Sequence, residues 1–417
     1  MRQLYNLGMG LLAIGLQVGS WRSTKLRQMV QGRMGLFERL RAFRNTSPGP
    51  LAWFHVASLG EYEQAKPVIR AFRESRPQWQ VVVSFFSPSG YEHVIKRPQP
   101  HVDFITYLPI DSPGNARRFL QILYPNISFF VKYDLWANHI LAAKSLGVPL
   151  FLIAAAFREQ QVYFNKTYGG FFRRMLGHFD HVFTQQPLPA AMIERLGLKS
   201  VSVAGDPRYD NVNAISQSPK SFPEVSKGIA KPVLVGGSVW QEDMDRIIPF
   251  ICAHPEYQYI LAPHDIHAKA IEEWISALPG KTLRYTHLDL QDPQPWDTLI
   301  IDNIGMLSSL YQYARVAYVG GAFGKGLHNI LEPLAFRIPV IFGRLKQRGK
   351  FPEWEISQNY GCGFAVQTAA DFESVMTQLT DETTYERASL DADRLLNDNL
   401  GSARKIMEIV NQKLTNG

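Results

Sequence analysis

The sequence predicts an α/β fold in which two Rossmann-like domains face a central cleft. Short apolar runs, typical of buried strands, alternate with helical patterns from Leu51 to Phe342. One stretch rich in Ser, Pro and Lys, residues 216–231, interrupts this alternation and is typical of a linker. With 417 residues, the chain is also long for a single hydrophobic core.

These patterns divide the chain into four segments. Residues 1–45 form a basic segment with a membrane-associating helix, residues 46–215 an N-terminal domain, residues 216–231 the linker, and residues 232–417 a C-terminal domain. A ligand cleft is expected between the two domains, because open α/β sheets bind ligands outside the carboxyl ends of their strands.

The N-terminal segment carries the net charge of the chain. The whole chain has a formal charge of +7, and residues 1–44 hold eight basic residues against Glu38 alone, so the remainder balances to zero. An uncharged apolar stretch from Leu4 to Trp21 precedes most of these cations and is at the short limit for a membrane span. The cations place the following chain in the cytoplasm if the stretch spans, and attract anionic lipid headgroups if it lies in the interface. A cleaved signal peptide and a plain buried helix are the alternatives.

Each apolar run is expected to form one strand. In the N-terminal domain the runs are Leu51–Val56, Val81–Phe86, Phe104–Leu108, Ile127–Tyr133, Pro149–Ala154, Val182–Thr184 and Val201–Ala204. In the C-terminal domain they are Pro232–Gly236, Tyr259–Ala262, Leu299–Asp302, Val316–Val319 and Pro339–Phe342. This alternation of strand and helix predicts parallel sheets covered on both faces.

Composition and spacing exclude several classes of protein. Outside the N-terminal segment there is no net field for a nucleic acid. Cys252 and Cys362 lie in unrelated contexts, which indicates neither a disulfide framework nor a thiolate metal site. His267 and His328 are too far apart for an H-x-x-x-H site, so no metal is expected. The absence of G-x-S-x-G, Walker and G-x-G-x-x-G motifs disfavours hydrolases, ATPases and dehydrogenases.

The most informative motif is GGAFGKGLHNILEPL, residues 320–334. It follows a predicted strand, and a helix is expected to open near Glu332. Glycines let backbone N–H groups approach an anion, and a helix N-terminus favours negative charge. Glu332 would accept hydrogen bonds from a ribose diol, which indicates a nucleotide carried by an activated sugar. A tight strand-to-helix turn without a ligand is the alternative.

Polar residues follow other predicted strands. Glu61, at the start of the first helix of the N-terminal domain, is a candidate general base; alternatively it only complements the helix dipole, which would lower its pKa. Gly236-Gly237-Ser238 is a candidate phosphate loop or an ordinary turn. His264 is a candidate nucleotide contact or a surface histidine. The acidic pairs at residues 243–245 and 391–393 are expected to lie on solvated helix faces.

Taken together and in order, these pieces resemble the bacterial Kdo transferases along nearly the whole chain. That family consists of membrane-associated GT-B glycosyltransferases, which move 3-deoxy-D-manno-octulosonic acid (Kdo) from CMP-Kdo to the lipid A precursor. Besides the apolar N-terminus with its basic flank, the resemblance lies in HVASLGE (55–61), SPSG (87–90), YLPID (107–111), GDPRYD (205–210), GS (237–238), DNIG (302–305) and GGAFGKGLHNILEP (320–333).

The resemblance implies an inverting glycosyltransferase of lipopolysaccharide biosynthesis, bound to the cytoplasmic face of the inner membrane. Its N-terminal domain would bind the acceptor, lipid IVA, and its C-terminal domain CMP-Kdo, without a metal or other cofactor. Inner membrane lipids are the further partners that this implies. A sugar-nucleotide epimerase and a non-catalytic, membrane-bound nucleotide-sugar binding protein are the alternatives.

The resemblance also assigns roles to single residues. Glu61 matches the catalytic base, Asp134 keeps one acid of a Glu-Thr-Glu stretch, and Arg208 stands at a lysine that contacts phosphate or carboxylate. The positions that match the cytidine nucleotide site are Ser238, His264, Gly321, Asn329 and Glu332. The chain departs from the family at Lys132-Tyr133, at Pro263-His264-Asp265 in place of Pro-Arg-His, and at Ala154-Ala155-Ala156 in place of Asn-Ala-Arg. These changes affect acceptor and nucleotide recognition.

Overall fold

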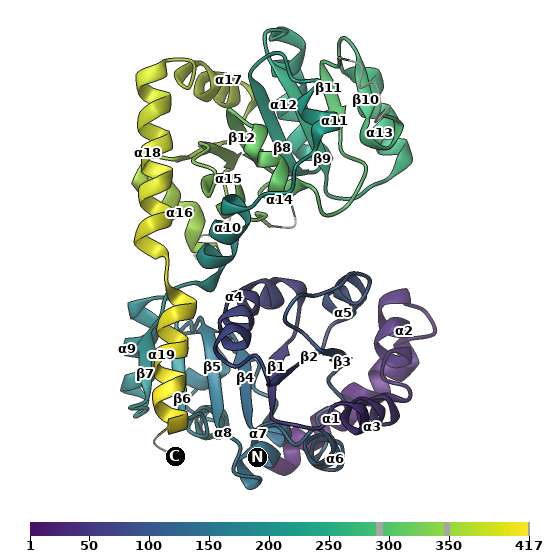
Figure 1. The fold of residues 1–417 in the computed structure, drawn as a ribbon, viewed down its shortest axis with the longest axis vertical. Helices are drawn as coiled ribbons and strands as arrows, with labels where there is room; N and C mark the ends of the chain where they lie inside the picture. The colour runs from purple at the N-terminus through teal and green to yellow at the C-terminus, as the bar shows by residue number, and fades with distance from the viewer. Residues whose placement is uncertain (289–294, 325, 346–350, 416–417) are drawn as a thin grey trace. The chain divides into compact units, whose positions relative to one another are not determined.

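The computed structural model describes residues 1–288, 295–324, 326–345 and 351–415, and the chain forms two compact units (Figure 1). The first unit contains Met1–Asn211 together with the C-terminal helix α19 (Ser402–Thr415), and the second contains Val212–Asn399. Each unit is a parallel-sheet α/β domain, so the predicted pair of such domains is confirmed.

The first unit is built on a seven-stranded sheet in the order β3-β2-β1-β4-β5-β6-β7, in which every neighbouring pair is parallel. The strands are β1 (Leu51–Val56), β2 (Gln80–Phe85), β3 (Phe104–Tyr107), β4 (Ile127–Val131), β5 (Leu150–Ala155), β6 (His181–Thr184) and β7 (Val201–Val203). The direction of winding reverses between β1 and β4. Ligands of open α/β sheets bind at such a reversal, outside the carboxyl ends of the strands.

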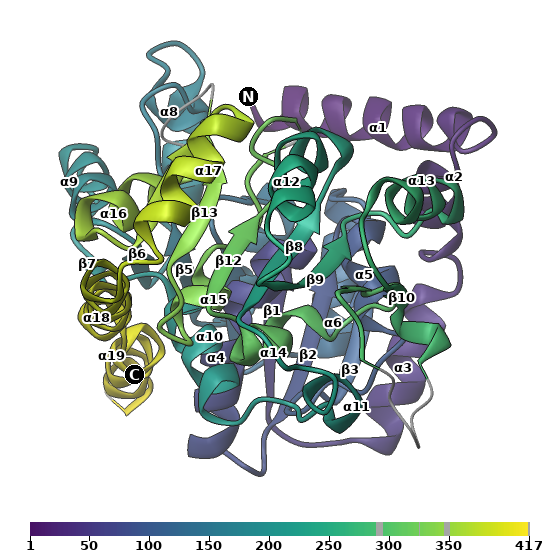
Figure 2. The ribbon, with the colours of Figure 1, turned by 90° about the horizontal axis from the view of Figure 1, so that it is seen from above.

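Helices cover both faces of this sheet (Figures 1 and 2). They are α1 (Arg2–Gly19), α2 (Thr24–Gln31), α3 (Leu36–Thr46), α4 (Leu59–Ser75), α5 (Pro88–Val94), α6 (Pro113–Leu123), α7 (Ala137–Ser145), α8 (Gly169–Leu176) and α9 (Pro187–Arg195), while α10 (Pro207–Gln217) leads out of the unit. Local sequence explains their starts. At α6, for example, the Ser112 hydroxyl accepts the backbone N–H of Asn115 and Pro113 occupies the first turn.

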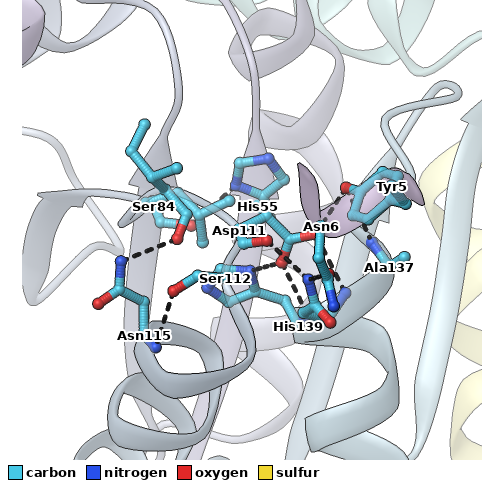
Figure 3. Close-up of polar contacts among 12 residues, drawn as sticks. Tyr5, Asn6, His55, Ser84, Asp111, Ser112, Asn115, Ala137 and His139 are labelled. Carbon is cyan, nitrogen blue, oxygen red and sulfur yellow. Dashed lines mark hydrogen bonds and ion pairs between the residues drawn. The ribbon is translucent and has the colours of Figure 1, made fainter. Parts of the chain in front are cut away.

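A buried polar network fastens α1 to the first unit (Figure 3). The Asp111 carboxylate accepts hydrogen bonds from the Tyr5 hydroxyl at 2.6 Å and from the His139 Nδ1 at 2.5 Å. The backbone N–H groups of Asn138 and His139 also donate to it, each at 3.0 Å. The Asn138 amide in turn donates to Asn6 at 2.9 Å. Because Asp111 is fully buried, Tyr5 and Asn6 make α1 an integral part of the domain.

The structure differs from the prediction at the C-terminus, where α19 packs on the first unit. Its buried residues join the core between α4 and the sheet; they are Ala403, Ile406, Met407 and Val410. The Asp210 carboxylate accepts the backbone N–H groups of Gly401 and Ala403, both at 2.7 Å, and so caps the start of α19. Residues 232–417 therefore do not form one domain, because the apolar face of α19 is buried against α4.

The second unit repeats the architecture with a seven-stranded parallel sheet in the order β10-β11-β9-β8-β12-β13-β14. Its strands are β8 (Val233–Val239), β9 (Gln258–Pro263), β10 (Thr282–Arg284), β11 (Thr298–Ile300), β12 (Val316–Val319), β13 (Val340–Gly343) and β14 (Gly363–Val366). Its helices are α11 (Pro223–Ser226), α12 (Gln241–Ala253), α13 (Ala268–Ala277), α14 (Leu307–Leu310), α15 (Leu331–Leu334), α16 (Pro352–Tyr360), α17 (Ala369–Gln378) and α18 (Glu382–Asn399). The winding reverses between β8 and β12.

The predicted linker, residues 216–231, is a packed segment of the second unit. The buried side chain of Gln258 accepts the N–H groups of Ala230 and Lys231 at 2.6 and 2.9 Å and donates to the carbonyl of Gly228. Prolines and serines here shape turns that bind back onto β9, which composition alone does not distinguish from a free linker.

Candidate catalytic and nucleotide-binding sites

Glu61 and Asp134 lie on either side of the reversal point of the first sheet. Glu61 is in the first turn of α4, directly after β1, and Asp134 follows β4. Glu61 is only 5% exposed, and its Oε2 accepts the backbone N–H of Ala57 at 2.6 Å. The predicted position of Glu61 at the carboxyl edge of the sheet is therefore confirmed.

The environment of Glu61 weakens its acidity. Burial, and next the charge of Asp134, raise its pKa from 4.5 to about 7, although the Ala57 N–H and the Lys132 ammonium act in the opposite direction. Burial also raises the pKa of Asp134, against an opposing effect of Lys132. The sequence left open whether the helix dipole keeps Glu61 a weak base. Burial outweighs the stabilising contacts, which suits a base that works near neutral pH.

Strained backbone marks the same edge of the first sheet. Lys132, after β4, has φ +63°, and Ala154, in an irregularity of β5, has φ +52°. Residues other than glycine adopt this left-handed conformation at a cost, and such positions gather at functional sites. Both lie in the stretches where the sequence departs from the Kdo transferase motifs.

Arg208 lies in the first turn of α10. Its Nε and one terminal nitrogen donate to Asp206 Oδ2 at 2.9 and 2.7 Å. Both bonds end on the same carboxylate oxygen, and they hold the guanidinium near the end of the first unit.

In the second unit, Ser238 sits in a bulge at the carboxyl end of β8. The pairing with β9 shifts register between Gly237 and Val239, and Ser238 has φ +53°. The candidate loop Gly236-Gly237-Ser238 is thus the distorted end of a strand rather than a separate turn. The bulge turns the backbone where the sheet reverses, close to the glycines that follow β12.

Asp243 organises this edge of the second sheet. Its Oδ2 accepts the backbone N–H groups of Trp240 at 2.9 Å and Gly321 at 3.0 Å, and its Oδ1 accepts the Tyr318 hydroxyl at 2.7 Å. A Cβ atom on Gly320 would lie 2.6 Å from that same Oδ2, so only glycine allows the loop to lie this close to the Asp243 carboxylate. Asp243 is 1% exposed. The prediction that residues 243–245 form a solvated helix face is therefore wrong for Asp243.

Three aromatic rings stack beside this loop. His264, after β9, packs against both Trp240 and His328, with ring centroids 4.4 Å from each and interplanar angles of 25°. The Trp240 indole N–H donates to His328 Nε2 at 3.3 Å. Burial, and next the neighbouring His264, lower the pKa of His328 to about 4, so this ring is neutral at physiological pH. A flat aromatic surface of this kind suits stacking by a nucleobase.

The GGAFGKGLHNILEPL motif ends in a short helix, as predicted. Gly321 has φ +95°, and α15 spans only Leu331–Leu334, so the dipole of this helix is small. The Asn329 side-chain amide donates to Glu332 Oε1 at 3.1 Å, which orients that carboxylate. Lys325 of the motif lies outside the described residues.

The structure thus collects the predicted residues into two groups, one on each sheet. Glu61 and Asp134 form the first, and Ser238, His264, Gly321, Asn329 and Glu332 the second, while Arg208 lies on α10. Sequence reasoning missed Asp243 and Trp240. The available signal was the acid three residues after Trp240 at a helix start, a position from which a carboxylate bonds back to the chain. No cluster of three or more metal-ligating side chains occurs among the residues that the structure describes.

The two parallel-sheet α/β domains have a fold of the GT-B type. Solved structures with this fold include the UDP-GlcNAc 2-epimerase of Neisseria meningitidis bound to UDP-GlcNAc, with a TM-score of 0.60, 15% identity and coverage of 87% of this chain and 99% of that one. Acinetobacter baumannii MurG matches with a TM-score of 0.55, 13% identity and coverage of 88% and 100%. At such identities these likenesses show the fold alone.

Sequence comparison identifies the family within that class. Residues 30–211 match the family model of the 3-deoxy-D-manno-octulosonic acid transferases. Enzymes of that name are similar in Chlamydophila psittaci, with 27% identity over 75% of this chain and 74% of the relative, and in Bordetella pertussis, with 27% over 82% and 83%. The Haemophilus influenzae enzyme is 24% identical over 91% of both chains. The resemblance seen in the sequence is confirmed: the chain is a glycosyltransferase that is similar to the Kdo transferases over most of its length.

Proposed function

We propose that this enzyme transfers Kdo from CMP-Kdo to a lipid A precursor, with inversion, at the cytoplasmic face of the inner membrane. The relatives support Kdo as the transferred group. The observation that carries the mechanism is Glu61, a buried carboxyl group with a raised pKa at the reversal point of the first sheet. A base with a pKa close to the working pH is both ionised and strong enough to accept a proton.

In this mechanism Glu61 takes the proton of a sugar hydroxyl on the acceptor. An electron pair of the deprotonated oxygen forms the bond to the anomeric carbon of Kdo. On the opposite face, the bond between that carbon and the CMP oxygen breaks, and its electron pair leaves with CMP. Asp134 keeps the pKa of Glu61 high and contacts the acceptor. Negative charge develops on the departing phosphate, so donors that favour this charge accelerate the reaction.

The second domain is proposed to bind the CMP part of the donor. Backbone N–H groups near Ser238 and Gly321 approach the phosphate, the stack around His264 receives the cytosine, and Glu332, oriented by Asn329, accepts the ribose hydroxyls. Arg208 is proposed to contact the phosphate or the Kdo carboxylate, exchanging part of its pairing with Asp206.

The membrane part of the proposal rests on the outer face of α1. Five apolar side chains at helical spacing form one stripe, and each is more than half exposed; they are Leu4, Leu7, Leu11, Ile14 and Val18. Trp21 follows at 77% exposed, before the cations of α2. Among the described residues, no helix has the length and apolarity needed to cross a bilayer. A docked helix with an outward apolar stripe suits binding in the interface plane.

This membrane proposal is tested with the double substitution Leu7→Gln, Leu11→Gln. Both side chains are exposed, so the fold is expected to persist, whereas deletion of residues 1–22 would remove Tyr5 and Asn6 from their buried network. The variant is expected to leave the membrane fraction and to keep its activity on detergent-dispersed acceptor. Unchanged membrane retention would show that the stripe is not the anchor.

The transfer itself is tested by incubating purified protein with CMP-Kdo and lipid A precursor, followed by mass spectrometry of the lipid. A product heavier by Kdo supports the proposal. Turnover of the sugar nucleotide without any acceptor would instead indicate an epimerase on the same scaffold. Binding of CMP with no transfer to any acceptor would indicate a nucleotide-sugar binding protein.

A further inference from the structure

A polar pocket lies beneath the first turn of α1, between α6 and α7. Its volume is about 390 Å³. The residues that line it are Arg2, Pro113, Arg117, Gln121, Asn138 and the α7 residues Leu141, Ala142, Ser145 and Leu146. Arg117 and Gln121 project from one face of α6 with Pro113, because residues four apart on a helix are neighbours.

The pocket contains two arginines and no acidic residue. Arg2 reaches only the Asn138 Oδ1, at 3.5 Å, and among the residues that the structure describes no carboxylate pairs with Arg2 or Arg117. The adjacent Arg118 is different: it lies 3.6 Å from Glu38 and stacks over Phe37 at 4.2 Å. Of these two neighbouring residues, Arg117 lines the pocket, whereas Arg118 is paired with Glu38.

Two guanidinium groups that line one pocket favour an anion with several oxygens. Like charges at short range repel each other, and an anion between them removes this cost. The planar N–H fork of arginine matches phosphate and carboxylate oxygens in pairs. The amide of Gln121 and the hydroxyl of Ser145 are available for neutral parts of the ligand. The volume of the pocket accommodates a phosphate ester rather than a large substrate.

The position of the pocket on α1 identifies the source of that phosphate. The pocket includes Arg2, the first residue of α1, and the outward apolar stripe begins at Leu4, two residues further on. Tyr5 and Asn6 fix this end of the helix to α7, so Arg2 and the stripe cannot move independently (Figure 3). A helix whose apolar face enters the bilayer interface carries its flanks at the level of the lipid headgroups.

We propose that this pocket binds the phosphate of an anionic membrane lipid and so fixes the N-terminal end of α1 at the bilayer surface. The inference rests on the membrane association proposed above. The cations after Trp21 serve the other end of α1, so the helix is held to anionic lipid at both ends and by apolar contact between them. This arrangement sets the orientation of the first domain on the membrane.

The test compares Arg117→Gln with the matched control Arg118→Gln in the full-length protein. Both remove one charge from α6, so a long-range field alone predicts equal effects. Binding is measured by co-sedimentation with vesicles of phosphatidylcholine and with equal mixtures of phosphatidylcholine and phosphatidylglycerol. We expect Arg117→Gln to weaken binding to the mixed vesicles about fivefold and Arg118→Gln clearly less. Gln121→Glu, which adds a carboxylate to the pocket wall, is expected to act like Arg117→Gln.

Several results would overturn the proposal. Equal effects of the two arginine variants, or an equal effect of Arg117→Gln on pure phosphatidylcholine vesicles, would remove the pocket from lipid binding. Binding of inorganic phosphate that depends on Arg117, without any effect on vesicles, would assign the pocket to a soluble phosphate. Melting temperatures by circular dichroism confirm that the variants fold.

Kdo transfer to detergent-dispersed acceptor is a separate readout and is expected to be unchanged in Arg117→Gln. A parent protein without transferase activity but with Arg117-dependent vesicle binding would contradict the proposed function and leave the lipid pocket supported. Loss of that transfer in Arg117→Gln alone would mean that the pocket serves the acceptor reaction, and would overturn its assignment to membrane lipid.

Discussion

Replacing Glu61 with Gln separates the charge of this side chain from its shape. A glutamine oxygen can still accept the Ala57 N–H, which now lies 2.6 Å from Oε2, but the amide cannot take a proton. If Glu61 is the general base, the rate of Kdo transfer should fall by roughly 10²–10⁴-fold. In the parent enzyme kcat/KM should fall as the pH drops through about 7, because Glu61 becomes protonated.

The same substitution should stabilise the protein, with a definite pH dependence. The pKa of Glu61 rises from 4.5 to about 7 on folding, so the folded state holds this proton more tightly than the unfolded state. Stability from this proton is fully present below pH 4.5 and is lost as the pH rises through 7. This rise of the pKa by roughly 2.5 units corresponds to about 3 kcal/mol in the free energy of unfolding. Glutamine does not ionise and escapes this loss.

The assay is urea unfolding of the two proteins at a series of pH values, with hydrogen exchange of β1 and α4 peptides to assign the change to the first domain. At pH 4 the two proteins should be equally stable, and above pH 8 the variant should be more stable by up to about 3 kcal/mol. A stability difference that does not vary with pH would refute the buried, raised pKa. Near-normal turnover of the folded variant would remove Glu61 from the role of base.

Three further substitutions probe the surrounding structure. Asp243→Asn places an amide against backbone donors, so it should lower the free energy of unfolding by about 1–3 kcal/mol and raise KM for CMP-Kdo. The exposed control Asp245→Asn should change neither quantity. Thermal unfolding and steady-state kinetics measure the two effects. Tyr5→Phe should lower the free energy of unfolding by about 1–3 kcal/mol and speed hydrogen exchange in α1, because Asp111 loses a buried donor. Unchanged exchange would show that this hydrogen bond does not hold the helix. Gly321→Ala, at φ +95°, should weaken CMP binding by roughly 1–2 kcal/mol in calorimetry, and unchanged affinity would exclude this loop from the nucleotide site.

Most of the fold could be predicted because buried parallel strands appear in the sequence as continuous runs of apolar residues. β1 and β12 occur at the predicted bounds, and most other predicted runs correspond to strands with ends shifted by a few residues. β10 and β14 escaped prediction because they lie at the two ends of their sheet. The residues of β10 are only partly buried, so this strand needs no apolar run and leaves little pattern.

The site was predictable where chemistry follows directly after a strand, as at Glu61, and less so where it depends on folding. The pKa of Glu61 is raised by burial in the packing around α4 and by the charge of Asp134, which is distant in sequence. Asp243 illustrates the same limit, since an Asp-x-Asp pair on a helix is usually solvated. Here the first turn of that helix lies under a glycine loop contributed by β12, and this contact is invisible before the sheet is assembled.

The placement of α19 has a consequence for how the chain matures in the cell. The nascent polypeptide leaves the first unit after Asn211 and supplies the helix that completes the apolar cover of α4 only from Ser402 onward. The ribosome must therefore make the entire second unit before the first can close its core, so the usual order in which N-terminal domains finish folding first does not apply. Until then the apolar side of α4 is open to chaperones. The contacts of α19 with α4 therefore form last, once the whole chain has been made.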